Sequence, residues 1–321
     1  MTNFKTSDTQ KKIVVVGSIN CDQIAYLEQF PKPNQTINAK HAALSVGGKG
    51  LNQAVSAAHA GADVSMIGSI GDDLFGKMAL KQLKASGIDI SAIKTTPEQG
   101  TGTATIFVTE NSENMIAVAA GANASLSPED IIVHKAIIEN SDALIVQLET
   151  PLETVREALK IAVNAGVMTI LNPAPAVKVI GDLLKLSTVL TPNETEVEEL
   201  VGIYPKDDKT CADAVKNLRK LGASNIIITL GDKGVYCACS GEEILVPAPQ
   251  VKAIDPTGAG DVFNGVLAVA LSTGFGYSES ARIASAAATL SVTRKGAANA
   301  APGWTEVESF LKENNQEANK C

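Results

Sequence analysis

The chain has 321 residues, of which 45% are hydrophobic and 19% charged, and its formal net charge is −8. This composition is typical of a compact globular protein with a large core, and it excludes an intrinsically disordered chain. The acidic balance argues against a nucleic-acid partner, since such proteins normally present a basic face.

The cysteine pattern and the N-terminus indicate the compartment. The five cysteines are odd in number and scattered, so neither a disulfide framework nor a zinc site fits them. They are Cys21, Cys211, Cys237, Cys239 and Cys321. Residues 1–10 are polar and show no secretory signal, and no segment reaches the roughly 18–20 apolar residues of a membrane span. We therefore expect a cytoplasmic protein without a membrane partner.

Apolar strands alternate with helical patterns along most of the chain. In chain order, strands are predicted at 12–16, 63–68, 143–148, 167–171, 188–190 and 225–230, and helices at 50–61, 74–86, 152–165, 194–201 and 211–221. Short Val/Ile runs separated by amphipathic helices favour a mainly parallel sheet that is covered on both faces. The predicted fold class is α/β. We expect one domain at 12–313, between a flexible tail at 1–11 and a polar tail at 314–321.

Two segments break this alternation. Residues 23–45 contain no helical pattern, and residues 101–119 alternate around the turn-forming stretch Asn111–Asn114. In such a strand, Thr103 faces away from Ala104, and the alternation continues to Thr109. We predict that these segments form a small antiparallel lid. A sheet of this size is not stable alone and must pack on the main domain or on a partner subunit.

The segment Asp255–Asp261, with the sequence DPTGAGD, leads into the apolar run 262–270. A helix that begins here presents unpaired backbone N–H groups and a partial positive charge, and such helix starts bind anions. Gly258, Ala259 and Gly260 leave room for a phosphate, and a carboxylate at Asp261 suits phosphoryl transfer to a hydroxyl. The alternative is a glycine turn in which Asp261 caps the helix.

A second glycine-rich segment, Gly47–Asn52, precedes the first predicted helix. It fails the P-loop pattern because no Ser or Thr follows Lys49. The later segment fails the dinucleotide-binding pattern because position 263 is Phe. The first segment is therefore either a tight strand-to-helix turn or part of a different anion-binding motif.

Together, Gly47–Asn52 and Asp255–Asp261 resemble the two signatures of the PfkB family of ribokinase-like carbohydrate kinases. Supporting stretches follow in the same order over nearly the whole chain: 17–22, 120–128, 147–151, 172–175, 191–194 and 292–296. The resemblance implies a three-layer α/β/α ribokinase-like fold. It also implies an ATP-dependent kinase that converts D-ribose to D-ribose 5-phosphate. A 2-deoxyribose or nucleoside kinase of the same family, and a catalytically inactive sugar-binding regulator, remain alternatives.

The resemblance assigns roles to residues on the sugar side. It implies that Asp261 is the general base and that Gly258, Ala259 and Gly260 stabilise the phosphate charge. The implied sugar-binding residues are Asn20, Asp22, Gly48, Lys49, Gly50, Asn52, Glu149 and Asp261. Without the resemblance, Glu149 would be an ordinary loop carboxylate.

On the nucleotide side, the implied ATP-binding residues are Asn193, Thr229, Gly231, Asp232, Lys233, Gly234, Gly260 and Ser285. Glu196 matches a family position that helps to organise Mg²⁺ indirectly. The spacing from Asn193 to Glu196 also fits a helix capping box, and both interpretations can hold together. Ser285 stands where the family often has Asn or His near the adenine.

The resemblance further implies a potassium site built mainly from carbonyl oxygens. Its residues are Asp255, Thr257, Ser291, Arg294, Gly296 and Ala300. Ala300 departs from the serine common in the family, so one side-chain ligand is missing. The expected ligands are thus ribose, ATP, Mg²⁺ and K⁺, and the expected assembly is a homodimer formed through the lid.

Overall fold

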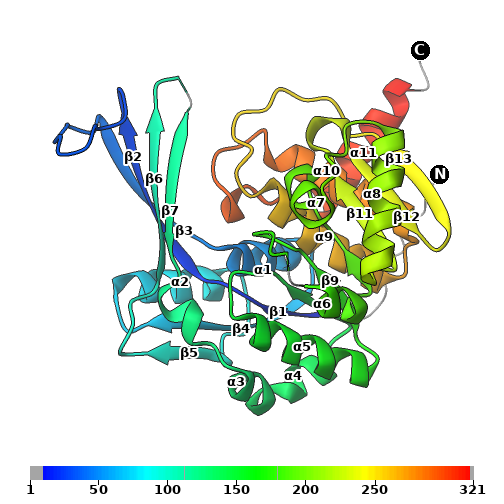
Figure 1. The fold of residues 1–321 in the computed structure, drawn as a ribbon, viewed down its shortest axis with the longest axis horizontal. Helices are drawn as coiled ribbons and strands as arrows, with labels where there is room; N and C mark the ends of the chain where they lie inside the picture. Colours follow the sequence, from blue (N-terminus) through cyan, green and yellow to red (C-terminus); the bar gives the residue numbers. More distant parts are fainter. Residues whose placement is uncertain (1–9, 112, 179, 319–321) are drawn as a thin grey trace.

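The computed structural model describes residues 10–111, 113–178 and 180–318. They form a three-layer α/β/α body with a small second sheet that stands away from it (Figure 1). Most of the predicted tail at 1–11 lies outside the described residues. The last helix, α11 (Trp304–Ala318), extends into the predicted tail at 314–321.

The central sheet has nine strands in the order β13-β12-β11-β10-β9-β8-β1-β4-β5. Their bounds are β1 Lys12–Val16, β4 Asp63–Gly71, β5 Ile93–Thr96, β8 Ala143–Val146, β9 Met168–Leu171, β10 Val189–Leu190, β11 Asn225–Thr229, β12 Val235–Cys239 and β13 Glu242–Val246. The pairs from β11 through β5 are parallel, and the β11–β12 and β12–β13 pairs are antiparallel. The predicted mainly parallel α/β fold is confirmed.

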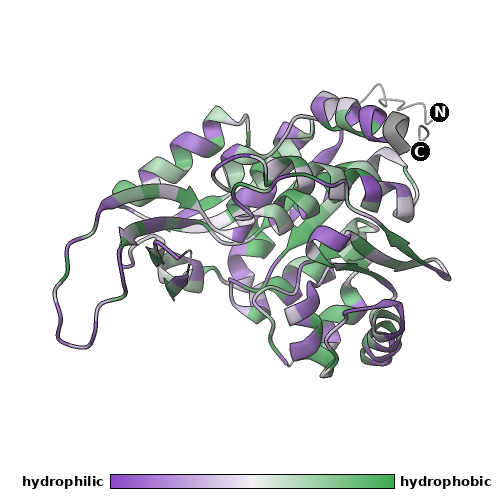
Figure 2. Ribbon diagram, turned by 90° about the horizontal axis from the view of Figure 1, so that it is seen from above, coloured by the Kyte–Doolittle hydropathy of each residue, from purple (hydrophilic) through white to green (hydrophobic). Residues whose placement is uncertain are grey.

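Helices cover both faces of this sheet because its strands are apolar on both sides. Ile13 and Val15 of β1 belong to one core, whereas Val14 and Val16 belong to the other. Figure 2 shows the hydrophobic strands between these two layers. The first core includes α1 (Lys49–His59), α2 (Leu74–Ala85), α9 (Ala259–Thr273), α10 (Tyr277–Ser291) and α11. The second includes α3 (Pro128–Val133), α4 (Lys135–Glu139), α5 (Leu152–Ala165), α6 (Gly181–Leu186), α7 (Glu194–Val201) and α8 (Asp208–Leu221).

The predicted elements agree with these bounds to within a few residues. Helices α5 and α7 match their predicted limits. Helix α8 begins at Asp208, earlier than the predicted Cys211, because Asp207 caps it and forms a reciprocal capping box with Thr210. Within the described residues, no helix combines the length and apolar character that a membrane crossing requires.

The lid is a four-stranded sheet in the order β3-β2-β6-β7. Its strands are β2 Asn20–Leu27, β3 His41–Gly47, β6 Gly102–Thr109 and β7 Asn114–Ala119. The small sheet was expected, and its two outer pairs are antiparallel, but its central β2–β6 pair is parallel. The reason is that β2 follows β1 and β6 follows β5, which both belong to the parallel part of the main sheet.

Helices α1 and α9 cross at Gly265. A Cβ atom at this position would lie 2.6 Å from the carbonyl oxygen of Gln53 and 2.6 Å from the Cβ of Ser56. The Ser56 hydroxyl also donates to the carbonyl of Val262 at 3.0 Å. Only glycine permits this approach, which brings together the two helices that begin at the glycine-rich motifs.

We expect Gly265→Ala to lower the free energy of unfolding by about 1–3 kcal/mol, because the two backbones must separate to admit a methyl group. Urea unfolding measures the change. Gly181→Ala is the matched control, since a Cβ there would meet its nearest atom at an ordinary 3.8 Å. Equal stabilities of the two variants would contradict a tight crossing.

Candidate active site

Both glycine-rich motifs lie at helix starts near the carboxyl ends of parallel strands, where open α/β sheets bind ligands. Gly48 precedes α1 with φ 93°, and a Cβ atom at Gly48 would lie 2.8 Å from the backbone nitrogen of Asn20. A Cβ at Gly50 would lie 2.6 Å from the backbone carbon of Gly17, just past β1. The start of α1 therefore packs directly against the end of β1.

Asp261 does not cap helix α9. Gly258 precedes the helix in a left-handed conformation, and no side chain caps the helix start. The Asp261 carboxylate instead accepts hydrogen bonds from Asn52 Nδ2 at 2.9 Å and from Gln53 Nε2 at 3.0 Å. The capping alternative is excluded, and the two glycine-rich motifs meet at this carboxylate.

The electrostatics of Asp261 depend on burial and on one lysine. Burial raises its pKa; Lys49, Asn52 and Gln53 counteract this, and the pKa remains above the ordinary range. Burial would lower the pKa of Lys49, but the charges of Asp261, Glu149 and Glu196 outweigh it, and that pKa is raised. Lys49 is therefore held as a cation among carboxylates.

The predicted sugar-binding residues converge around this centre. Asn20 and Asp22 begin β2, and Glu149 follows β8. One carboxylate oxygen of Glu149 accepts from Ser18 Oγ at 2.5 Å and from the backbone nitrogen of Lys49 at 3.2 Å. Burial and the charges of Glu149 and Asp261 raise the pKa of Asp22 to about 6. A positive or hydrogen-bond-donating ligand would relieve this repulsion.

One further observation indicates a polar ligand here. The Oδ1 atom of Asn52 is buried without a hydrogen-bond partner among the described residues, although the Nδ2 atom of the same amide donates to Asp261. Buried polar atoms in proteins are normally paired, so an orphaned acceptor beside Asp261 favours a ligand that donates.

Two neighbouring cavities share the lining residues Asn193, Thr229, Pro256, Ala259 and Gly260. The smaller cavity has a volume of about 180 Å³ and is lined mainly by polar residues, among them Lys49 and Asp261. The larger, of about 420 Å³, includes residues predicted to bind ATP: Thr229, Gly231, Asp232, Gly234, Gly260 and Ser285. Lys233 lies next to it in η2 (Gly231–Lys233), but its ammonium group donates to the carbonyl of Lys206.

Glu196 lies in the smaller cavity at the start of α7. Its carboxylate accepts from the backbone nitrogen of Asn193 at 2.9 Å, and the Asn193 side chain accepts from the Glu196 nitrogen at 2.8 Å. The capping box is therefore real, and it leaves Glu196 facing the cavity. Burial raises the pKa of Glu196 to about 7. A bound cation would favour its ionised form.

The predicted potassium residues form two adjoining loops. The Asp255 carboxylate accepts from the nitrogens of Thr257 at 3.0 Å and Gly296 at 2.9 Å, and its pKa is lowered. The Arg294 side chain pairs with Glu306. Ala300, in η3 (Ala298–Ala300), is buried. The Asp255 carboxylate therefore joins the two loops that carry these residues.

Sequence reasoning missed the residues behind Asp261. Gln147 Nε2 donates to Gln53 Oε1 at 2.7 Å, and Gln53 Nε2 donates to Asp261 and, at 3.2 Å, to Asn172 Oδ1. Asn264 Nδ2 donates to the carbonyl of Gly260 at 2.8 Å and thus fixes the turn of α9. No sequence signal marks these amides, because their burial and their hydrogen bonds arise only in the fold.

Known proteins resemble this chain over nearly its whole length. Residues 10–304 match the pfkB family of carbohydrate kinases. A ribokinase of Haemophilus influenzae is 41% identical and covers 94% of this chain and 99% of its own length. A deoxyribokinase of Salmonella typhi is 35% identical with the same coverage. The structure of Arabidopsis thaliana ribokinase complexed with ribose and ATP superposes with a TM-score of 0.89, at 32% identity over 95% of this chain and 99% of that one.

The chain therefore belongs to the pfkB family of carbohydrate kinases. Members of this family are phosphotransferases with an alcohol acceptor, and this chain is an enzyme of that class. The fold is the ribokinase fold.

We expect Asp22→Asn to stabilise the unliganded protein at pH 8 by about 1 kcal/mol. The pKa of Asp22 is raised to about 6 in the fold. The stability that its protonated form provides is therefore present at low pH and is lost as the pH rises through about 6. Asparagine does not ionise, so the variant does not lose this stability. The difference in the free energy of unfolding between the variant and the wild type should therefore be smaller at pH 5 than at pH 8.

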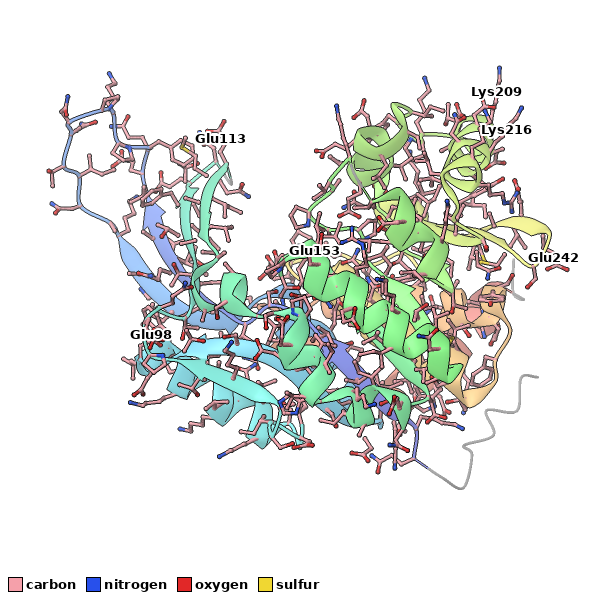
Figure 3. The ribbon with its side chains drawn as sticks, turned by 60° about the horizontal axis from the view of Figure 1, so that its bottom comes forward. Glu98, Glu113, Glu153, Lys209, Lys216 and Glu242 are labelled. Atoms are coloured by element: carbon pink, nitrogen blue, oxygen red, sulfur yellow. The ribbon has the colours of Figure 1, made fainter. Side chains whose placement is uncertain are left out.

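Urea unfolding across this pH range measures the effect. Glu98→Gln, at an exposed carboxylate just beyond β5 (Figure 3), is the control and should show no such dependence. A pH-independent difference between Asp22→Asn and the wild type would contradict the proposed repulsion.

Proposed function

We propose that this enzyme transfers the γ-phosphoryl group of ATP to the 5-hydroxyl of D-ribose, giving D-ribose 5-phosphate and ADP. The observation that carries the proposal is the buried Asp261 carboxylate at the start of α9, which makes no cap and is held by Asn52 and Gln53. The sugar-binding candidates Asp22 and Glu149 lie close enough to influence its charge, and the cavity with the ATP-binding candidates adjoins the smaller cavity that Asp261 lines. The 41% identity to a ribokinase supports ribose as the acceptor.

In the proposed reaction, Asp261 accepts the proton of the sugar hydroxyl as that oxygen attacks phosphorus. Its raised pKa makes the ionised carboxylate a stronger base than an exposed aspartate. The backbone N–H groups at Gly258 and Gly260 stabilise the negative charge that develops on the transferring group. The N–H of Ala259, which the sequence assigned to the same role, instead donates to the carbonyl of Pro256 at 3.2 Å. Mg²⁺, when bound, would neutralise phosphate charge, and Glu196 would help to organise it indirectly.

The remaining polar residues orient the two substrates. We assign the sugar to Asn20, Asp22, Gly48, Lys49, Gly50, Asn52 and Glu149, and ATP to Asn193, Thr229, Gly231, Asp232, Lys233, Gly234, Gly260 and Ser285. Lys49 also balances the charge of the carboxylates that surround it. The 35% identity to a deoxyribokinase favours 2-deoxyribose as the second candidate substrate. A coupled assay of ADP release with both sugars separates the two.

We expect Asp261→Asn to lower kcat by on the order of 10²–10⁴-fold, because the amide cannot accept the hydroxyl proton. The affinity for ATP should stay within a few-fold, since the backbone at the start of α9 is unchanged. Stopped-time assays of ribose 5-phosphate give kcat, and calorimetry gives ATP binding. A kcat within a few-fold of the wild type would remove Asp261 as the base.

Potassium should raise activity above that in sodium or in a bulky organic cation. The loops that hold Asp255, Ser291 and Gly296 adjoin the start of α9, so a cation there would shape the phosphate-binding turn. Initial rates in matched chloride salts test this. Ala300→Ser, which restores a hydroxyl ligand, should lower the potassium concentration at half-activation. Equal rates in all salts would contradict a functional cation site.

We also propose a homodimer through the lid, in a cytoplasmic enzyme. Ile24, Ile106 and Ile116 are in register on one face of the lid, and Ile116 is 57% exposed. A second lid would cover this apolar face.

Ile116→Asp should therefore shift the protein toward monomers, because association would bury a charge. Light scattering at several concentrations measures the mass. Ile132→Asp on α3, outside the lid and 49% exposed in the wild type, is the control and should leave the mass unchanged. A wild-type protein that is monomeric and fully active would refute the dimer.

A further inference from the structure

Asn123 lies far from Asp261 in the sequence, within the stretch 120–128 that contributes to the family resemblance. It belongs to the short 3₁₀ helix η1 (Gly121–Ser125), which follows the last lid strand. Its side chain is only 2% exposed. The amide makes three hydrogen bonds, all to Ile19 and Asn20 at the start of β2.

The backbone of Ile19 fixes the orientation of the Asn123 amide. The Ile19 nitrogen donates to Asn123 Oδ1 at 2.9 Å, and the Ile19 carbonyl accepts from Asn123 Nδ2 at 3.1 Å. A backbone N–H can only donate and a backbone carbonyl can only accept, so the two ends of this amide cannot be exchanged. The Nδ2 end is therefore the one that faces Asn20.

This orientation determines the orientation of Asn20 in turn. Asn123 Nδ2 donates to the Asn20 side chain at 2.8 Å, so the atom that it meets must be the acceptor Oδ1. The Nδ2 of Asn20 makes no hydrogen bond within residues 10–111, 113–178 and 180–318. Asn20 is only 5% exposed, and its acceptor Oδ1 is already paired with Asn123. The donor Nδ2 is therefore the atom of this amide that remains for a ligand.

Gly102, the first residue of β6, leaves the space that the hydrogen-bonded side chains of Asn20 and Asn123 occupy. A Cβ atom at Gly102 would lie 2.2 Å from Asn20 Oδ1 and 2.3 Å from Asn123 Nδ2. Any side chain there would displace one of the two amides. The beginning of β6 and the segment after β7 thus enclose Asn20 from both ends of the lid hairpin.

We propose that Asn123 is a positioning residue for sugar recognition, which holds Asn20 so that only its N–H donor is presented to a hydroxyl oxygen of the pentose. The inference rests on the proposed function, because it takes the ligand of Asn20 to be the sugar. It adds a specific interaction: Asn20 donates a hydrogen bond to an acceptor oxygen of the sugar. Asn123, which touches no substrate, fixes the orientation of Asn20 that makes this bond possible.

Two substitutions at Asn123 remove the donor to Asn20. Asn123→Asp keeps the size and the acceptor for the Ile19 nitrogen, and Asn123→Ala removes the donor without adding charge. Either releases Asn20 to turn its N–H away from the sugar. We expect the KM for ribose to rise about 5- to 150-fold, the effect of one unpaired buried group, while the KM for ATP stays within about two-fold.

A double-mutant cycle separates positioning from a merely structural role. In an Asn20→Ala background, the substitutions at Asn123 should no longer change the ribose KM, because the group through which they act is gone. Asn140→Asp, at an exposed asparagine that ends α4, is the matched control for the same chemical change and should have no effect on this KM. An equal rise in KM with and without Asn20 overturns the inference.

A further variant tests the donor without disturbing Asn123. Asn20→Asp keeps the acceptor for Asn123 Nδ2 but has no N–H to offer, so it should weaken ribose binding as much as Asn20→Ala. Ribose binding equal to that of the wild type overturns the inference even if no variant at Asn123 folds. A wild-type enzyme that phosphorylates no ribose refutes the proposed function instead, and the first assay of the unmodified protein shows it.

Discussion

The site depends on one buried carboxylate that two helices hold in common. Asp261 lies at the start of α9, and its partners Asn52 and Gln53 lie on α1, more than 200 residues earlier in the chain. The absence of a Cβ atom at Gly265 lets these helices approach closely enough for the contacts to form. Burial keeps the pKa of Asp261 high, and the two amides keep its oxygens in a fixed direction. Both properties support the proposed role of Asp261 as a general base.

The charges around Asp261 make the unliganded site electrostatically unfavourable. Lys49 is surrounded by Asp261, Glu149 and Glu196, while burial and like charges raise the pKa of Asp22. This excess of negative charge suits hydroxyl groups and metal cations, which donate or neutralise. The N–H groups at the start of α9 offset it only where the phosphate is expected. The carboxylates that favour ligand binding therefore lower the stability of the unliganded protein, as is common at functional sites.

The lid is joined to this centre by hydrogen bonds as well as by chain connectivity. Strand β2 carries Asn20 and Asp22, so two of the proposed sugar-binding residues also lie at the start of a lid strand. Asn123 and Gly102 secure the same point from the other lid strands. A movement of the lid would therefore change the orientation of Asn20, whereas Asp261 and its amides belong to the body.

The sequence by itself determined the α/β class, the positions of most strands and helices, and the two motifs. These are local properties: hydrophobic periodicity, glycine turns and a carboxylate next to a predicted helix start. Helix α7 and its capping box were readable because Asn193 and Glu196 are three residues apart. The resemblance to the pfkB family, which rests on the same motifs, supplied the candidate ligands.

Only the tertiary structure decided which polar residues act together. Gln53, Gln147 and Asn172 are far apart in the sequence, and the hydrogen bonds that join them to Asp261 span more than 200 residues. The parallel pairing of β2 with β6 and the contact of Asn123 with Asn20 were equally unreadable. The physical reason is that a hydrogen bond between distant residues leaves no periodic signal in the chain, because it exists only after both backbones have been placed.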